Sequence, residues 1–313
     1  MSQAPVRYKI QNWPEYNQAL IRRGDITWWF DQDVIAQWQQ GQRTGRRGRP
    51  VVYSDVALQC MLALRLLYRL PLRAAQGLLG SLLGLLGCML PVPNYSTLCR
   101  RQRHLSLDLG VSPTEGPRHV LVDSTGLKVF GEGEWKVRQH GVGKRRTWRK
   151  LHLAVDAKTR EIVAMALTES NRSDCEMLPS LLLQIDGKLS KVGADGAYDT
   201  WECRYAIIQR EALAVIPPGT DAVINGNDQI EEVRQRDQAI REIKENGLKA
   251  WKQNSDYHQR SLAETAMFRV KTSFGGELKS RVIQNQIAEA VMKSHILNRF
   301  IQEGLPQSVR LED

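Results

Sequence analysis

The pattern of apolar and polar positions divides the chain into a helical first third and a longer part in which strands alternate with helices. Asp31 and Ser54 are candidate N-caps, and Leu70-Pro71 ends one of the helical patterns. Three short helices, the last one basic, are compatible with a helix-turn-helix-like module, although many bundles share this pattern. Expected core residues are Trp28, Trp29 and Phe30. Apolar residues recur at helical spacing over residues 13–40, 54–67, about 72–86 and from about 96.

Residues 110–117, rich in Gly, Ser and Pro, are typical of a linker. We therefore predict a mostly helical region over residues 1–112 and a second domain over residues 113–313. The second domain has the expected order β-β-β-α-β-α-β, with a hairpin turn at Asp156, which describes an α/β fold with a mixed sheet. The expected strands are 119–123, 147–155, 161–167, 189–194 and 212–216, and the expected helices are 173–185 and 200–211.

A polar insert over about residues 218–256 interrupts the second domain. Its apolar residues mark an amphipathic helix that we expect to pack on the sheet edge. Helices are expected at 257–271 and 283–301, followed by a polar, mobile tail beyond Pro306. The apolar residues of the insert helix are Ile230, Val233, Ile240 and Ile243.

Positive charge is concentrated in the helical region of this chain, whose formal net charge is +10. Between Val34 and Leu107 the one acid is Asp55, so this segment would attract phosphates, and nucleic acid is the expected partner. Residues 41–50 form either a minor-groove arm or a solvated linker. Candidate DNA contacts here are Arg46, Arg47, Arg49, Arg100, Arg101 and Arg103.

The five cysteines are odd in number and scattered, which fits a reducing cytosol better than a disulfide framework or a zinc site. The N-terminus lacks the pattern of a signal peptide. Residues 74–92 carry no charge, but glycines and Pro91 interrupt them, so we expect a buried helix and no membrane partner.

Three acidic residues lie at positions where active sites commonly form. Asp123 follows the first strand, Asp195 follows the fourth, and strand ends converge on one edge of an open sheet. On the helix over 257–271, Glu264 lies within about 60° of Tyr257, Arg260 and Lys271. Taken singly, each acid could have a purely structural role: Asp123 and Asp195 as turn residues, and Glu264 as the ion-pair partner of Arg260.

Together, three carboxylates in one cleft would repel one another unless cations offset them. Oxygen ligands suit Mg²⁺, and two such ions about 4 Å apart stabilise both oxygens of an in-line phosphodiester displacement. We expect two Mg²⁺ ions held by Asp123, Asp195 and Glu264, with Mn²⁺ as a substitute. Arg260 and Lys271 would hold the DNA backbone, and Tyr257 would contact a phosphate or a base.

The spacing Tyr257-x2-Arg260-x3-Glu264-x6-Lys271 matches the signature of DDE transposases from bacterial insertion sequences, and its flanks resemble the insertion sequence five group. Val-Asp123-Ser-Thr-Gly and Ala-Asp195-Gly-Ala-Tyr-Asp resemble the first and second acid motifs of that group. The stretches 47–55 and 148–156 are also similar to segments that flank those motifs. The resemblance runs, in order, from the basic segment to about Pro306.

This resemblance implies a ribonuclease-H-like catalytic domain that acts in the bacterial cytoplasm on DNA of the nucleoid. Such transposases bind their terminal inverted repeats through the N-terminal region, cut there and join the 3′-hydroxyl to target DNA as a synapsed dimer or larger assembly. Tyr257, Arg260 and Lys271 carry over as donor-DNA contacts, and Trp251 is the candidate for a flipped base. Asp156 and Asp199 do not carry over as ligands; we expect a hairpin turn at Asp156 and a helix cap at Asp199.

Other readings stay open. A nuclease that only hydrolyses would share the three acids, and a repeat-binding repressor would need none of them. His140 and His152 are expected to be structural, since the proposed ions prefer oxygen ligands. Between the first two strands, a basic cluster would either guide DNA or form a solvated hairpin end: Lys144, Arg145, Arg146, Arg149 and Lys150.

Overall fold

The computed structural model of the chain describes residues 8–39, 52–129 and 147–311. The helical first third contains α1 (Trp13–Arg22), α2 (Gln32–Ala36), α3 (Asp55–Leu67), α4 (Leu72–Leu85) and α5 (Tyr95–Arg101), with 3-10 turns η1 (Ile26–Trp29) and η2 (Gln102–His104). Two predicted caps are confirmed. Asp31 accepts a hydrogen bond from the Val34 amide at 2.8 Å, and Ser54 accepts one from the Ala57 amide at 3.2 Å. Local sequence therefore sets where these helices begin.

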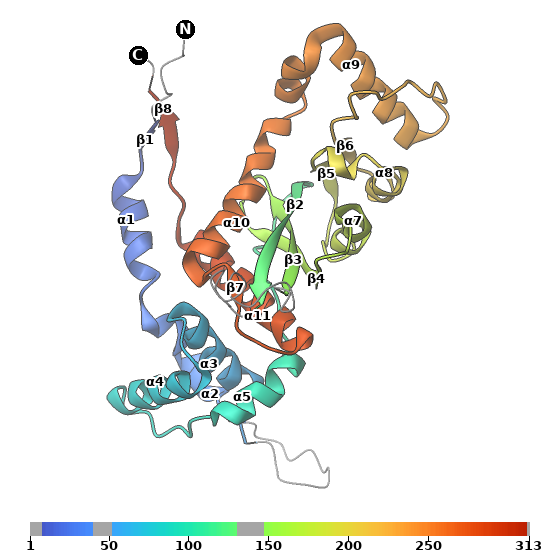
Figure 1. The fold of residues 1–313 in the computed structure, drawn as a ribbon. Helices are drawn as coiled ribbons and strands as arrows, with labels where there is room; N and C mark the ends of the chain where they lie inside the picture. Colours follow the sequence, from blue (N-terminus) through green and yellow to red (C-terminus); the bar gives the residue numbers. More distant parts are fainter. Residues whose placement is uncertain (1–7, 40–51, 130–146, 312–313) are drawn as a thin grey trace, which may run out of the picture.

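The predicted order of strands and helices along the chain is confirmed, and the strands form the predicted mixed sheet (Figure 1). Strands β2 (Arg118–Val129), β3 (Trp148–Asp156), β4 (Ile162–Glu169), β5 (Leu189–Gly193) and β6 (Leu213–Val215) lie in the order β4-β3-β2-β5-β6. The β4, β3 and β2 strands pair antiparallel, whereas β2, β5 and β6 pair parallel. A short strand, β7 (Glu277–Leu278), adds to the end of β2. This is the strand arrangement of a ribonuclease-H-like domain.

Helices cover both faces of the sheet. Side chains of β2 alternate between the two faces, so Val120 and Val122 pack with α7 (Asp174–Leu182) and α8 (Trp201–Ile208). Leu121 and Leu127 pack on the other face with α10 (Ser261–Phe274) and α11 (Ile283–Glu303), the latter matching the predicted core helix. Asp123 and Thr125 share this second alternation, which directs them towards the α10 side.

The helical region and the sheet share one hydrophobic cluster. Leu58 and Leu62 of α3 belong to the same buried cluster as Ile296 and Leu297 of α11, and this cluster continues to Leu121 of β2. Phe30 joins it, as predicted, whereas the side chains of Trp28 and Trp29 lie outside the described part. The division at residue 112 remains a prediction. Within the residues that the structure describes, no helix is long and apolar enough to cross a membrane.

The insert packs on the sheet edge as predicted. Its helix α9 (Glu231–Asn254) bends at Gly247, whose φ of 82° lies in the region that glycine tolerates. Val233 and Ile240 are buried, and the Ala214 amide of edge strand β6 donates to Gln235 at 3.0 Å. Ile230, expected on the packed face, is 41% exposed.

Several sequence expectations are wrong in detail. The helix expected to be buried within residues 74–92, α4, buries only Ala75, Leu79 and Leu83, and its Leu85 is 85% exposed. The first strand does not end at Asp123, because β3 pairs with β2 as far as Lys128 and Gly126 leaves room for the Trp148 ring, 3.2 Å from where a Cβ would lie. The helix expected over 257–271 is a 3-10 turn, η4 (Tyr257–Arg260), followed by α10. The C-terminal tail forms β8 (Ser308–Arg310), which pairs with β1 (Tyr8–Ile10) near the N-terminus.

Candidate active site

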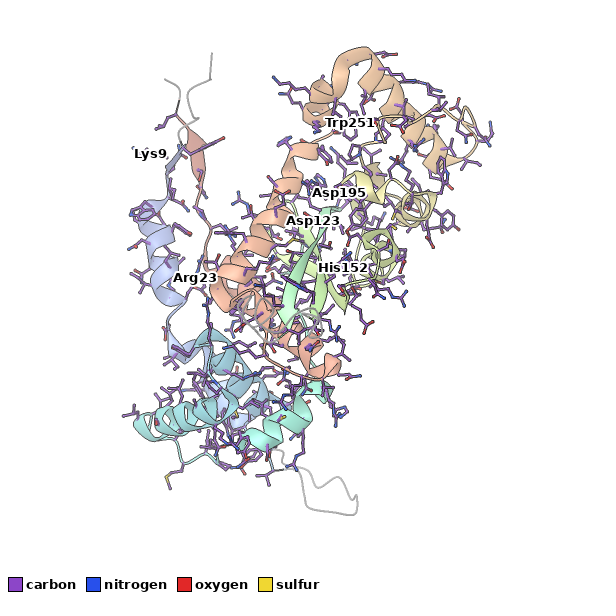
Figure 2. All side chains as sticks on the ribbon, in the orientation of Figure 1. Lys9, Arg23, Asp123, His152, Asp195 and Trp251 are labelled. Atoms are coloured by element: carbon purple, nitrogen blue, oxygen red, sulfur yellow. The ribbon has the colours of Figure 1, made fainter. Side chains whose placement is uncertain are left out.

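Strand register places Asp123 and Asp195 at one level of the sheet. Leu121 of β2 pairs with Gly193, the last residue of β5, and each acid lies two residues beyond this pair. Beyond Leu121 the β5 side of β2 has no partner in that ladder, so Asp123 lies mid-strand but at an open edge. Figure 2 shows both acids close together at this end of the sheet.

Asp195 also begins its own turn. Its Oδ1 accepts a hydrogen bond from the Ala197 amide at 2.9 Å and caps the 3-10 turn η3 (Gly196–Tyr198). The second oxygen of this carboxylate is not used by the cap. The turn therefore uses one carboxylate oxygen of Asp195 and leaves the other available to a ligand.

Arg260 links the first and third acids. Its Nη1 lies 3.0 Å from Asp123 Oδ2, and its Nη2 donates to Glu264 Oε1 at 2.5 Å. The Asp123 side chain is 17% exposed, whereas the Glu264 side chain is 53% exposed. One acid is thus enclosed by the fold and the other stands on the outer face of α10.

The three acids act on one another electrostatically. Burial raises the pKa of Asp123, and the charges of Asp195 and Glu264 raise it further. The Ser124 amide and the Arg260 guanidinium oppose this shift without cancelling it. A cation arriving beside Asp123 would therefore relieve repulsion that Arg260 offsets only in part.

The donor chemistry of the acids suits a hard divalent cation, since carboxylate oxygens are its usual ligands. In the described part of the chain, however, no group of three or more His, Cys, Asp and Glu side chains is arranged to hold a metal ion. Two of the three acids are engaged by Arg260 instead. For all three to share a cation, Arg260 would have to release at least one carboxylate.

The other signature residues divide between two contacts. Lys271 donates through Nζ to Thr125 Oγ1 at 2.6 Å, two residues beyond Asp123 on the same face of β2. Tyr257 interacts with Arg260 and also packs on the insert, with its ring centroid 5.6 Å from that of Trp251. A 3-10 turn places residues i and i+3 on the same side, so Tyr257 stays beside Arg260 while its ring packs on the insert.

Trp251 is buried, at 4% exposure, and packs with Val215 and Ala239. It also lines a cavity of about 420 Å³ between β6 and α9. As the side chain stands, it supports the insert and presents little surface to a base.

The remaining candidate DNA contacts are either exposed or already paired with other groups of the protein. Arg100 and Arg103 are exposed, whereas Arg101 donates to the Tyr53 carbonyl and pairs with Asp55, each at 2.6 Å. Arg149 donates to Gln286 and Lys150 to the Arg172 carbonyl. Outside the described residues lie Arg46, Arg47, Arg49, His140, Lys144, Arg145 and Arg146.

His152 and Asp156 have structural surroundings, as expected. His152 is fully buried against Thr168, and burial lowers its pKa to about 4, which keeps the ring neutral. Asp156 accepts hydrogen bonds from the Lys158 and Thr159 amides in the hairpin turn, and it also pairs with Arg118 at 2.6 Å.

The expectation for Asp199 is wrong. Thr200 caps α8, through its bond from the Cys203 amide, while Asp199 pairs with Arg204 and Arg236. Sequence analysis missed this cluster because Arg236 lies 37 residues away, in the insert. Its one sequence signal was the position of Asp199 inside the second acid motif.

Comparison with known proteins gives matches to family models and to solved structures, among them the following. One similar solved structure is the cryo-EM structure of the piggyBac transposase synaptic complex with hairpin DNA, at 10% identity and a TM-score of 0.38, covering 92% of this chain and 78% of that chain. A likeness this weak supports no argument. Two family models described as "Transposase DDE domain" match residues 114–298 and residues 21–132. Because the first of them spans more than half of the 313 residues, the chain belongs to the transposase DDE domain family.

Proposed function

We propose that this chain is the transposase of an insertion sequence of the insertion sequence five group. It binds the terminal inverted repeats of its element, cleaves DNA at the ends and joins the freed 3′-hydroxyl groups to target DNA. The observation that carries this proposal is the placing of Asp123 and Asp195 at one level of neighbouring strands, with Glu264 tied to Asp123 through Arg260.

Asp123, Asp195 and Glu264 would hold two Mg²⁺ ions, which Mn²⁺ can replace. Transposases of this family typically use a divalent metal, and the metal would supply charge stabilisation at the attacking and leaving oxygens of the phosphodiester. The enclosed Asp123 carboxylate fixes the inner side of the site, and the exposed Glu264 closes it from α10.

Arg260 and Lys271 would turn from their present partners to the DNA backbone. Arg260 offers paired donors to a phosphate, whereas Lys271 offers a compact charge beside Thr125. Tyr257, the first residue of η4, packs against Trp251 of the insert and would contact the DNA next to the reacting phosphate. We propose Trp251 as a base contact only in a state in which the insert has opened.

The helical region, residues 1–112, would recognise the repeats, and residues 113–313 would form the catalytic domain. Arg100 and Arg103 are exposed and free to approach phosphates, and Arg46, Arg47 and Arg49 would add a minor-groove arm. Two or more copies would bring two element ends together in a synaptic complex.

The test uses purified full-length protein, Mg²⁺ and labelled duplexes carrying the DNA that flanks the coding sequence on each side. We expect cleavage and joining by the wild type, and a loss of at least about a hundredfold in Glu264→Gln, because a ligand to the metal is removed. Glu202→Gln is the matched control, an exposed acid of α8 outside the proposed site.

Each alternative function predicts a different product. Cleavage without joined products would indicate a nuclease. Specific binding with no reaction in either protein would indicate a repeat-binding repressor. Equal cleavage and joining by the wild type and Glu264→Gln would contradict the role of the third acid.

A further inference from the structure

Asp199 connects the turn that carries Asp195 to the insert. Its Oδ1 accepts from Arg204 Nε at 2.8 Å, and its Oδ2 accepts from Arg236 Nη2 at 3.1 Å. Arg204 belongs to α8 and Arg236 to α9, so one carboxylate joins two helices that the sequence separates widely. We call Asp199, Arg204 and Arg236 the Asp199 cluster.

The Asp199 cluster lies almost completely out of water. Arg204 is fully buried, and the side chains of Asp199 and Arg236 are 8% and 17% exposed. Burial alone would raise the pKa of Asp199, but hydrogen bonds from Arg236 and the charge of Arg204 outweigh it and hold the pKa below its usual value. The carboxylate is therefore charged and shared between two cations.

Backbone groups extend the cluster to the start of the loop that follows β6. The Gly219 amide donates to Asp199 Oδ2 at 3.3 Å, and Arg204 donates to the Ile216 carbonyl at 3.1 Å. Arg236 also lies over the Trp201 ring, 5.4 Å from its centroid. Helix α8, the loop after β6 and helix α9 thus all meet at the Asp199 cluster.

The same carboxylate is rigidly linked to Asp195. Between them lies only η3, in which the Tyr198 amide donates to the Asp195 carbonyl and the Asp199 amide to the Gly196 carbonyl, both at 3.1 Å. Tyr198 is 1% exposed and packs beneath the sheet with Val122. A displacement of Asp199 would therefore move Asp195.

A fold-stabilising role alone does not require Arg236. Arg204 already neutralises Asp199, and a second buried cation adds a desolvation cost that its attraction to the carboxylate need not repay. What Arg236 adds is a link from the insert to the turn of the second acid.

We propose that Asp199 and Arg236 are positioning residues that fix the Asp195 carboxylate by seating the insert on its turn. This inference rests on the proposed function, since it concerns the geometry of the same site. The position of the insert on this turn thereby sets where the Asp195 carboxylate points.

The test compares Arg236→Gln with Arg234→Gln in the full-length protein. Both lie on α9, but Arg234 pairs with Glu231 of the same helix at the surface. With saturating flanking duplex, we expect Arg236→Gln to lower the single-turnover cleavage rate about tenfold and raise the Mn²⁺ concentration for half-maximal rate about tenfold. The Kd for DNA should stay within about twofold, and Arg236→Lys should recover part of the rate because it keeps the charge.

A second readout does not depend on cleavage. Binding of Mn²⁺ to the protein alone can be measured by electron paramagnetic resonance. It should weaken in Arg236→Gln and not in Arg234→Gln, while the Tm values of the two variants stay equal. If the wild type cleaves no DNA, the proposed function fails, and Mn²⁺ binding still decides the positioning role. Equal Mn²⁺ binding by the two variants would overturn it, as would a parallel loss of Tm, DNA binding and rate in Arg236→Gln.

Discussion

The helical region and the insert are attached to the rest of the molecule by different proportions of apolar and polar contacts. The helical region, at the far end of the molecule from α9, joins through apolar side chains such as Leu58 and Leu62, which merge with the cluster around α11 (Figure 1). The insert buries only a small apolar group of its own, Val215, Ala239 and Trp251. Hydrogen bonds and ion pairs hold much of the rest.

This difference has physical consequences. Apolar contacts are non-directional and depend little on pH or salt, so the helical region is attached as a permanent part of the core. Polar contacts need defined geometry and can be exchanged for contacts with water or a ligand at a small net cost. The insert, which lies beside the proposed site, therefore has the more adjustable attachment.

Truncation of the shared apolar cluster should have the largest effect. Leu62→Ala removes a fully buried side chain and should lower the free energy of unfolding by about 3 to 5 kcal/mol. Because the cluster spans both regions, guanidinium unfolding followed by circular dichroism should remain a single transition. Leu85→Ala, at a side chain 85% exposed, is the control and should change the free energy by less than about 0.5 kcal/mol. A separate early transition of the helical region would contradict the shared core.

Asp199→Asn should have the next largest effect, about 3 kcal/mol at pH 7, since it leaves two largely buried arginines without their carboxylate. The pKa of Asp199 is lowered in the folded state, so its contribution is complete above the unfolded value of 3.8 and is lost as the pH falls through the folded value. Urea unfolding at a series of pH values should show a constant difference between pH 6 and 8 that closes as the pH falls below 3.8 and through the folded value.

The matched control for that series is Asp228→Asn, which removes a solvent-exposed partner of Arg241. Its effect should stay below about 0.5 kcal/mol at every pH. Hydrogen exchange should locate the loss in Asp199→Asn to residues 217–256. Equal loss of protection in α3 would show that the insert is not held separately.

Lys191→Gln should have the smallest effect. Lys191 of β5 pairs with Asp256, just before η4, at 2.7 Å, and the two side chains are 28% and 40% exposed. We expect a loss of about 0.5 to 1 kcal/mol at low salt that disappears at about 0.5 M NaCl, because salt screens exposed pairs. The loss in Leu62→Ala should persist at both salt concentrations. A salt-independent effect of Lys191→Gln would place this pair with the permanent contacts.

Local sequence determined the helix starts at Asp31 and Ser54, the extent of α3 and α4 to within a residue, and the order of strands and helices around the sheet. Each depends on side chains that act on their own neighbourhood: a cap on its first turn, or an apolar period on one element. The spacing of the signature residues was likewise visible in the sequence.

Only the tertiary structure decided how far β2 extends past Asp123, where Tyr257 turns, and what Asp199 binds. Pairing with β3 extends β2, and the packing of the insert against Tyr257 directs its ring. Asp199 pairs with an arginine far away in the sequence, and Thr200 caps α8 in its place. These outcomes depend on contacts between residues far apart in the chain, whose energies exceed local preferences and leave no periodic trace in the sequence.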